Sequence, residues 1–212
     1  MWRAWIAFVP SSNRSMNGPQ QAALILASAS PRRRELLSAC GMVFEVIVSD
    51  ADESALPREE PQQLVERLAL AKARVVSERR PHAWIIGADT VVVLDSEILG
   101  KPEDQADAAR MLAKLQGREH QVFGGVAVIN RELQIEVSCH SISRVKFVPL
   151  GAAAIERYIE SGEPLDKAGA YAIQGRGAAL VSEVAGSYTN VVGLDLAKLM
   201  GLLKDLGFFL GE

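Results

Sequence analysis

The sequence predicts an α/β protein with a mixed, twisted sheet and flanking helices. Apolar runs of strand length alternate with amphipathic segments of helix length along most of the 212 residues, which is typical of α/β folds. Two long strand-like runs follow each other across a polar turn at Asn130, so this pair is expected to be antiparallel. Nearly half of the residues are hydrophobic, enough for the core of one sizeable domain.

The first elements have clear start and stop signals. The apolar run Leu24–Ala27 predicts a strand. Pro31–Cys40 is predicted to be a helix, because Ser30 is a good N-cap and proline suits the first helical position. Gly41 is placed to end this helix, and Val43–Val48 is the second predicted strand.

The alternation continues to the C-terminus. Apolar residues at helical spacing predict a long helix over 61–79, after the charged loop 49–60. Further strands are expected at 84–95, 122–129 and 133–148, further helices at 103–116, 151–160 and 194–206, a turn at 96–102, and a glycine-rich loop with short strands at 161–188.

The first 21 residues are expected to be a flexible extension, followed by a single domain over residues 22–212. The initial apolar piece is interrupted by Arg3 and ended by Pro10, so it is too short to span a bilayer and makes a poor signal peptide. The residues that follow it are polar and rich in turn formers, with little to bury.

Composition excludes several kinds of partner. The net charge of −3 argues against a general nucleic-acid binder and against binding to acidic membranes. The two cysteines form no CxxC pair, and the three histidines lie far apart, so no zinc-type cluster is expected. Together these features indicate a cytoplasmic protein.

Three arginines, Arg32, Arg33 and Arg34, occupy the first turn of a predicted helix. A helix N-terminus carries partial positive charge, so each cation there costs about 0.3–1 kcal/mol. Either these side chains extend into solvent, which is the usual outcome for an arginine pair, or they help the helix N-terminus to bind an anion such as phosphate.

Several other charged residues interrupt the pattern. Asp89 lies within the apolar run "WIIGADTVVVL", where it needs a partner or a cleft, unless Gly87 bends the chain and Asp89 lies in a turn. Lys72 lies at the edge of an apolar helix stripe, and taken alone it is best interpreted as a lysine that reaches out to solvent. Lys167 is surrounded by small residues that let a ligand approach the backbone.

Carboxylates and scattered cations on loops at strand ends suit a site for a metal ion and a polyphosphate. Carboxylates hold Mg²⁺ and activate water, while arginine and lysine neutralise phosphate oxygens. The sequence contains neither GxGxxG nor GxxxxGK[ST], the usual glycine-rich phosphate loops.

Seven motifs, in order, resemble the Maf family of nucleoside triphosphate pyrophosphatases: "LASASPRRRELL", "FEVIVSDADES", "LALAKA", "GADTVVVLDSEILGKP", "HQVFGGVAV", "YIESGEPLDKAGAYAIQGRG" and "GSYTNVVGL". The resemblance covers about residues 24–207. It implies two lobes around a central cleft, as in inosine-triphosphatase-like folds, a divalent cation (Mg²⁺ or Mn²⁺), and often a homodimer. It also implies hydrolysis of a nucleotide between its α- and β-phosphates.

The resemblance also implies roles for individual residues. Asp89 matches the proton acceptor, and Glu53, Lys72 and Lys101 complete the catalytic group. Glu53 and Asp89 would hold the metal. The residues that would bind substrate are Ser28, Arg32, Arg33, Thr90, Lys167 and Gln174.

The motif details resemble the subgroup that prefers dTTP and UTP. Arg32 after "SP", Thr90 in "GADT", and Gln174 are the positions linked to substrate choice, and a 7-methyl-GTP-type relative would have tryptophan at position 32. Two alternatives stay open: a 7-methyl-GTP pyrophosphatase, and a nucleotide sensor without turnover that acts in cell-division arrest, a role linked to the family.

Two positions depart from the family pattern. Gly124 stands where threonine is usual, and Asp195 stands where proline is usual. We expect Gly124 to loosen the cleft wall and Asp195 to alter the start of the last helix, where an acid is tolerated. Neither departure touches the residues matched to catalysis.

Overall fold

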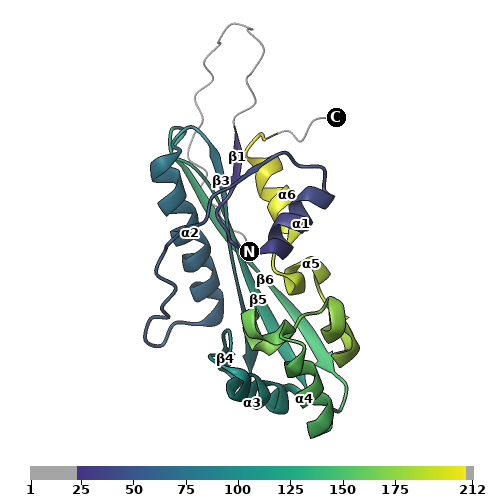
Figure 1. Ribbon diagram of the computed structural model, residues 1–212. Coiled ribbons are helices and arrows are strands. Elements are labelled where there is room, and N and C mark those ends of the chain that lie inside the picture. Colours follow the sequence, from purple (N-terminus) through teal and green to yellow (C-terminus); the bar gives the residue numbers. More distant parts are fainter. Residues whose placement is uncertain (1–22, 209–212) are drawn as a thin grey trace, which may run out of the picture.

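A mixed, seven-stranded sheet with long, twisted strands runs through the elongated molecule in the computed structural model, which describes residues 23–208 (Figure 1). The extension predicted over residues 1–21 lies outside the described residues. The strand order is β2-β1-β3-β5-β6-β7, and β4 pairs with β3. The strands are β1 (Leu24–Leu26), β2 (Glu45–Val46), β3 (Trp84–Leu94), β4 (Glu97–Leu99), β5 (Glu119–Asn130), β6 (Ile135–Phe147) and β7 (Val181–Ala185).

The sheet is parallel at one end and antiparallel elsewhere. β1 is parallel to both β2 and β3, whereas β3, β5, β6 and β7 pair in antiparallel fashion. The predicted antiparallel pair around Asn130 is confirmed, because Asn130 on β5 is paired with Ile135 on β6. The predicted mixed α/β fold is therefore confirmed.

Helices cover both faces of the sheet (Figure 1). α2 packs on one face, where Ala69, Ala73 and Val76 meet strand residues such as Ile85. α1 and α6 cover the other face, and α3 and α4 close the far end. The helices are α1 (Pro31–Ala39), α2 (Pro61–Arg79), α3 (Gln105–Leu115), α4 (Ala152–Glu160), α5 (Tyr188–Val192) and α6 (Leu196–Asp205), with 3₁₀ helices η1 (Glu163–Asp166), η2 (Ala168–Ala170) and η3 (Gly175–Leu180).

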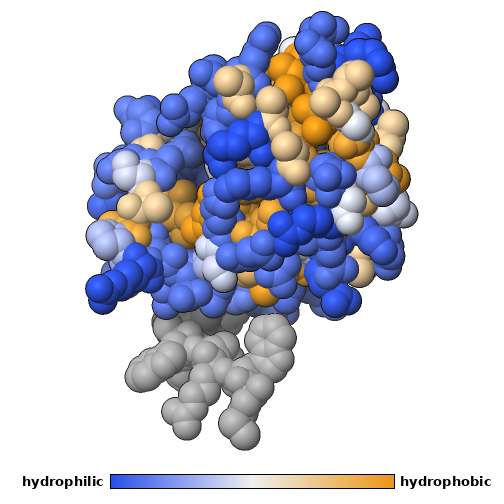
Figure 2. Space-filling model, turned by 90° about the horizontal axis from the view of Figure 1, so that it is seen from below, coloured by the Kyte–Doolittle hydropathy of each residue, from blue (hydrophilic) through white to orange (hydrophobic). Residues whose placement is uncertain are grey.

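Hydrophilic side chains cover most of the face seen in Figure 2, and hydrophobic ones show between them in patches. Within residues 23–208, no helix combines the length and the apolar character needed to cross a bilayer.

Two local predictions were wrong, and one strand is shorter than predicted. The segment 96–102 was expected to be a turn, but it contains β4, which forms a hairpin with β3 through Asp95 and Ser96. Both turn residues have positive φ (48° and 69°). In a two-residue hairpin turn of this kind the usual sequence signal is a glycine at the second position, where this chain has Ser96. The glycine-rich segment 161–188 holds three 3₁₀ helices and the single strand β7, and α5 begins at its end. The strand predicted at Val43–Val48 is present, but it is confined to Glu45–Val46.

Two glycines let the backbone of α2 lie directly on the sheet. A Cβ atom at Gly87 on β3 would lie 2.0 Å from the carbonyl oxygen of Ala69, and one at Gly125 on β5 would lie 2.1 Å from that of Val65. Gly87 therefore does not bend the chain, and β3 continues unbroken from Trp84 to Leu94. The close approach brings the next turn of α2, which carries Lys72, within reach of β3.

A Gly87→Ala substitution is expected to lower stability, because the added methyl group would meet backbone atoms that cannot rotate away. Overpacking of this kind costs about 1–3 kcal/mol, so the variant should unfold several degrees below the unmodified chain. Gly201→Ala on α6 is the matched control. Its Cβ would meet nothing within 4 Å, and alanine favours a helix by up to about 1 kcal/mol over glycine. Equal melting temperatures for Gly87→Ala and the unmodified chain would contradict the close packing.

Candidate active site

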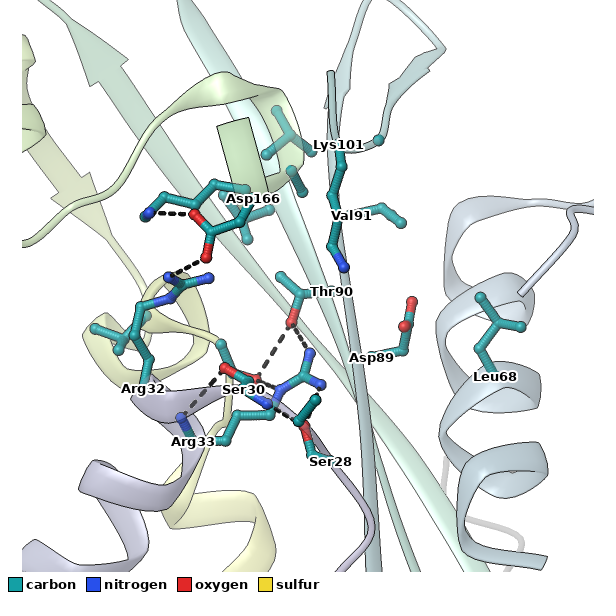
Figure 3. Close-up of a pocket in the computed structure, with 18 of the residues that line it drawn as sticks. Ser28, Ser30, Arg32, Arg33, Leu68, Asp89, Thr90, Val91, Lys101 and Asp166 are labelled. Atoms are coloured by element: carbon teal, nitrogen blue, oxygen red, sulfur yellow. Dashed lines mark hydrogen bonds and ion pairs between the residues drawn. The ribbon is translucent and has the colours of Figure 1, made fainter. Parts of the chain in front are cut away.

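One pocket of about 600 Å³ gathers residues from segments far apart in the sequence (Figure 3). Its wall includes the loop after β1, the start of α1, the loop before α2, one face of α2, the middle of β3, the turn before α3 and the segment around η1 and η2. The structure brings together here every site residue expected from the sequence: Ser28, Arg32, Arg33, Glu53, Lys72, Asp89, Thr90, Lys101, Lys167 and Gln174.

Three charged groups meet on the α2 side of the pocket. Lys72 Nζ lies 2.6 Å from Asp89 Oδ1 and 2.9 Å from Glu53 Oε2. Lys72 and Asp89 are buried, whereas the Glu53 side chain is half exposed. Lys72 is therefore no surface lysine, contrary to the interpretation of its position taken alone. Removal of one partner would leave the other charge buried and unpaired, which costs stability. Because its ammonium contacts both carboxylates, Lys72 holds them in place at the edge of the pocket.

Asp89 lies in the middle of β3, not in a turn. Its neighbour in the register is Gly125 on β5, and its carboxylate points into the space that the Lys101 side chain also enters (Figure 3). A charged side chain is tolerated within this apolar strand because its carboxylate is paired with Lys72 and faces the pocket.

Arg33 is held by neutral acceptors. Its Nε donates to Gly193 O (2.8 Å), its Nη1 to Ser28 Oγ (3.2 Å) and Ala88 O (2.9 Å), and its Nη2 to Thr90 Oγ1 (3.2 Å). These bonds use four of the five guanidinium N–H groups and fix the cation beside Ser28 and Thr90. Burial lowers the pKa of Arg33, and the charges of Asp89 and Glu53 act in the opposite direction.

The three adjacent arginines have different surroundings. Arg34 is exposed to solvent, as expected for an arginine whose side chain extends away from the protein. Among the described residues, Arg33 has no carboxylate within ion-pair distance, whereas Arg32 Nη1 lies 3.4 Å from Asp166 Oδ2. Ser30 caps the helix as predicted, because its hydroxyl accepts the N–H of Arg33 (3.5 Å). The unusual cationic helix start therefore supplies Arg32 and Arg33 to one pocket.

Lys101 and Gln174 face the pocket with free polar groups. Within residues 23–208, neither side chain forms a hydrogen bond or an ion pair. The turn that carries Lys101 is fixed by its neighbour Gly100, whose carbonyl accepts the N–H of Gly169 (2.9 Å). Gly169 has a φ of 69°, and a Cβ there would press on Val92 at 2.9 Å, so glycine is required.

Glu53 and Asp89 together suit a hard cation. No group of three or more metal-ligating side chains occurs among the described residues, so a metal bound only by protein is not expected there. Mg²⁺ is commonly held by one or two carboxylates together with water and substrate phosphates. The two carboxylates that converge on Lys72 fit that pattern.

Both departures from the family pattern have a structural account. A Cβ at Gly124 would lie 2.0 Å from Asn190 Oδ1, so the buried Asn190 amide occupies the space of a side chain. Gly124 is not among the residues that line the pocket, and the expectation that it loosens the cleft wall was wrong. Asp195 is the N-cap of α6, where it accepts the N–H of Lys198 (3.2 Å) and the hydroxyl of Ser141 (2.6 Å).

Three further residues near the site were not predicted from the sequence. Asp166 pairs with two pocket cations, Arg32 and Lys167. Burial favours the neutral acid, but the hydrogen bond and charge of Lys167, with Arg32, hold the pKa of Asp166 below its usual value. The only local signal was an acid directly before Lys167 in "LDKAGAYAIQG".

Tyr171 also lines the pocket, and its hydroxyl lies 2.8 Å from Nε2 of the buried His120. Burial lowers the pKa of His120 to about 4, so the ring is neutral at pH 7. This contact depends on long-range packing, and no local pattern in the sequence indicates it.

Comparison with known proteins shows which family this chain resembles. The Maf-like protein family model matches residues 23–206. A dTTP/UTP pyrophosphatase of Symbiobacterium thermophilum is 52% identical over 87% of this chain and 94% of that protein. A dTTP/UTP pyrophosphatase of Syntrophotalea carbinolica is 50% identical over 90% of this chain and 89% of that protein.

The fold also resembles a solved structure. The Staphylococcus aureus Ham1 protein superposes with a TM-score of 0.51 at 13% identity, covering 87% of this chain and 99% of that chain. At this identity the likeness shows the fold alone, and it confirms the predicted architecture. The family model matches residues 23–206 of this chain, and two relatives are about 50% identical to it over most of both sequences. This chain therefore belongs to the Maf family.

Proposed function

We propose that this chain hydrolyses UTP and dTTP to the nucleoside monophosphate and pyrophosphate. The observation that carries the proposal is the pocket itself, in which the partly buried Arg33, held by neutral acceptors, lies close to the Lys72–Asp89–Glu53 cluster. A cation without a carboxylate partner favours an anionic ligand, and a carboxylate beside it can accept a proton from water. The names of the two relatives support the same reaction.

In the proposed mechanism, Asp89 accepts the proton of the water that attacks phosphorus. As the new P–O bond forms, the bond to the leaving pyrophosphate breaks, and negative charge builds up on the phosphate oxygens. Lys101 and Arg33 stabilise that charge, as fixed cations do in water-excluding sites. Lys72 keeps Asp89 and Glu53 in place. A general base of this kind contributes about 10²–10⁴-fold in rate.

We also propose that Glu53 and Asp89 hold Mg²⁺ or Mn²⁺ together with the substrate phosphates. When bound, the cation would neutralise phosphate charge and lower the pKa of a coordinated water. Lys72 would then move or share its carboxylate partners, since both lie within 3 Å of Nζ here. The chain's resemblance to Maf proteins further supports a cytoplasmic homodimer.

Uracil and thymine would be recognised by Arg32 and Gln174. Each base presents two carbonyl acceptors around one N–H donor. Arginine offers only donors, and a glutamine amide offers both a donor and an acceptor. Cytosine replaces one carbonyl with an amino group and the N–H with an acceptor. Its amino group would then face an N–H donor of the protein, and each buried group left unpaired would cost about 1–3 kcal/mol.

The kcat/KM for UTP and dTTP is therefore expected to exceed that for CTP clearly. Action on 7-methyl-GTP should be weak, because its cationic purine would meet the cationic Arg32 instead of an aromatic face. Arg32→Ala should reduce the preference for UTP over CTP more than it slows hydrolysis of the poor substrate. Side-by-side kinetics with the four nucleotides test this, and a preference for CTP or 7-methyl-GTP would remove the subgroup assignment.

A nucleotide sensor without turnover remains the rival function. A sensor would bind UTP and leave it intact, so turnover by the unmodified chain separates the two. The free side chains of Lys101 and Gln174 and the carboxylate of Asp89 in one pocket favour the enzyme.

A further inference from the structure

Three carboxylates line the pocket among the described residues, and they lie in two places. Glu53 and Asp89 converge on Lys72 on the α2 side. Asp166, at the end of η1, stands on another wall and contacts neither of them. Its position needs a separate explanation.

Asp166 bridges two cations from distant parts of the chain. Its Oδ2 lies 3.4 Å from Nη1 of Arg32 in the first turn of α1, and its Oδ1 accepts a hydrogen bond from the adjacent Lys167 (Figure 3). The Asp166 side chain is 62% exposed, compared with 25% for Arg32 and 12% for Lys167. The carboxylate therefore lies at the open side of both cations.

The ion pairs of Asp166 contribute little to the stability of the fold. Exposed pairs contribute about 0–1 kcal/mol to stability, and Lys167 also donates to the carbonyl oxygen of Glu163 (2.5 Å). The carboxylate also acts on an incoming ligand, because it repels each negative charge of a polyphosphate that approaches Arg32.

The two neighbouring arginines thus differ in their attraction for an anion. Arg33 presents its charge to the pocket without a carboxylate partner among the described residues, whereas the charge of Arg32 is balanced by Asp166. Only one N–H of Arg32 is used by that contact, so the other donors stay available to a neutral ligand group.

We propose that Asp166 is a specificity-determining residue that keeps the polyphosphate off Arg32 and reserves this arginine for the base. The proposal rests on the proposed function, since it assigns the two ends of a nucleotide to different arginines. Asp166 would also hold the Arg32 side chain in the orientation that meets a carbonyl oxygen of the base.

The first test is a calorimetric titration with inorganic triphosphate in metal-free buffer, which requires no turnover. Asp166→Asn should bind triphosphate about three- to tenfold more tightly than the unmodified chain, because one repelling charge is removed. Asp166→Ser should behave alike if the charge is what matters. The matched control is Asp95→Asn, which removes an exposed ion pair with Arg118 (2.6 Å) outside the pocket and should leave the affinity unchanged.

The increase in triphosphate affinity should depend on Arg32. In an Arg32→Ala background, the Asp166→Asn substitution should therefore produce a clearly smaller increase in triphosphate affinity, as a double-mutant cycle measures. Equal affinities of Asp166→Asn and the unmodified chain, including the case in which neither binds, would overturn the proposal. An undiminished gain in the Arg32→Ala background would overturn it as well.

The second test measures substrate choice. Asp166→Asn should lower the ratio of kcat/KM for UTP to that for CTP severalfold, while Asp166→Glu, which restores the charge, should recover part of it. A merely structural role would lower the melting temperature and leave this ratio unchanged, and that result would overturn the assignment. If the unmodified chain failed to turn over UTP, the proposed function would be wrong. The triphosphate titration would still show whether Asp166 keeps polyphosphate away from Arg32.

Discussion

The Asp89→Asn variant is expected to fold, yet to hydrolyse UTP about 10²–10⁴-fold more slowly than the unmodified chain. The substituted amide cannot accept a proton from water, although its oxygen can still accept the hydrogen bond that Lys72 gives to Asp89. Lys72 also keeps Glu53 as a partner (2.9 Å), so the buried ammonium is not left alone. Steady-state kinetics and a thermal melt on the same sample would measure both effects.

Asp95→Asn provides the control for the loss of one negative charge, since Asp95 lies outside the pocket and this variant should retain full activity. Nucleotide binding by Asp89→Asn should persist, because the cations that would hold the phosphates are unchanged. Turnover by Asp89→Asn close to that of the unmodified chain would remove Asp89 from its role as proton acceptor.

Removal of divalent metal is expected to abolish activity. The proposed site has two carboxylates and no soft-ligand cluster among the described residues, which favours Mg²⁺ or Mn²⁺ over zinc. Activity should disappear in excess EDTA and return when either cation is added beyond the chelator. Initial rates across a titration of each metal would measure this.

Glu53→Gln sharpens the metal test, since it keeps the shape of the side chain and removes one anionic ligand. This variant should need a higher Mg²⁺ concentration for half-maximal rate. Full activity in the presence of chelator would contradict the scheme in which Glu53 and Asp89 hold a cation.

Strong local signals made much of the fold predictable. Pro61 and a regular apolar stripe gave α2 its observed bounds, and Ser30 with Pro31 located the start of α1. The predicted turn at 96–102 failed because Asp95 and Ser96 adopt left-handed conformations without glycine. The short helix α5 has five residues, too few for a helical period to show in the sequence.

The site was predictable in its membership more than in its geometry. Motif resemblance selected all ten expected residues that line the pocket. The contact between Lys72 and Asp89 depends on α2 lying against Gly87 and Gly125, which is a long-range feature that the pattern around Lys72 cannot reveal. Asp166 was missed for the same reason, because its partner Arg32 lies 134 residues away in the sequence.

If the proposed function is right, this pocket converts UTP to UMP and pyrophosphate. The most direct measurement is to incubate the purified full chain with UTP and Mg²⁺ and to follow all phosphorus-containing products by ³¹P NMR. We expect UMP and pyrophosphate in equal amounts, with no UDP. Formation of UDP and phosphate, or UTP that is bound and stays intact, would contradict it.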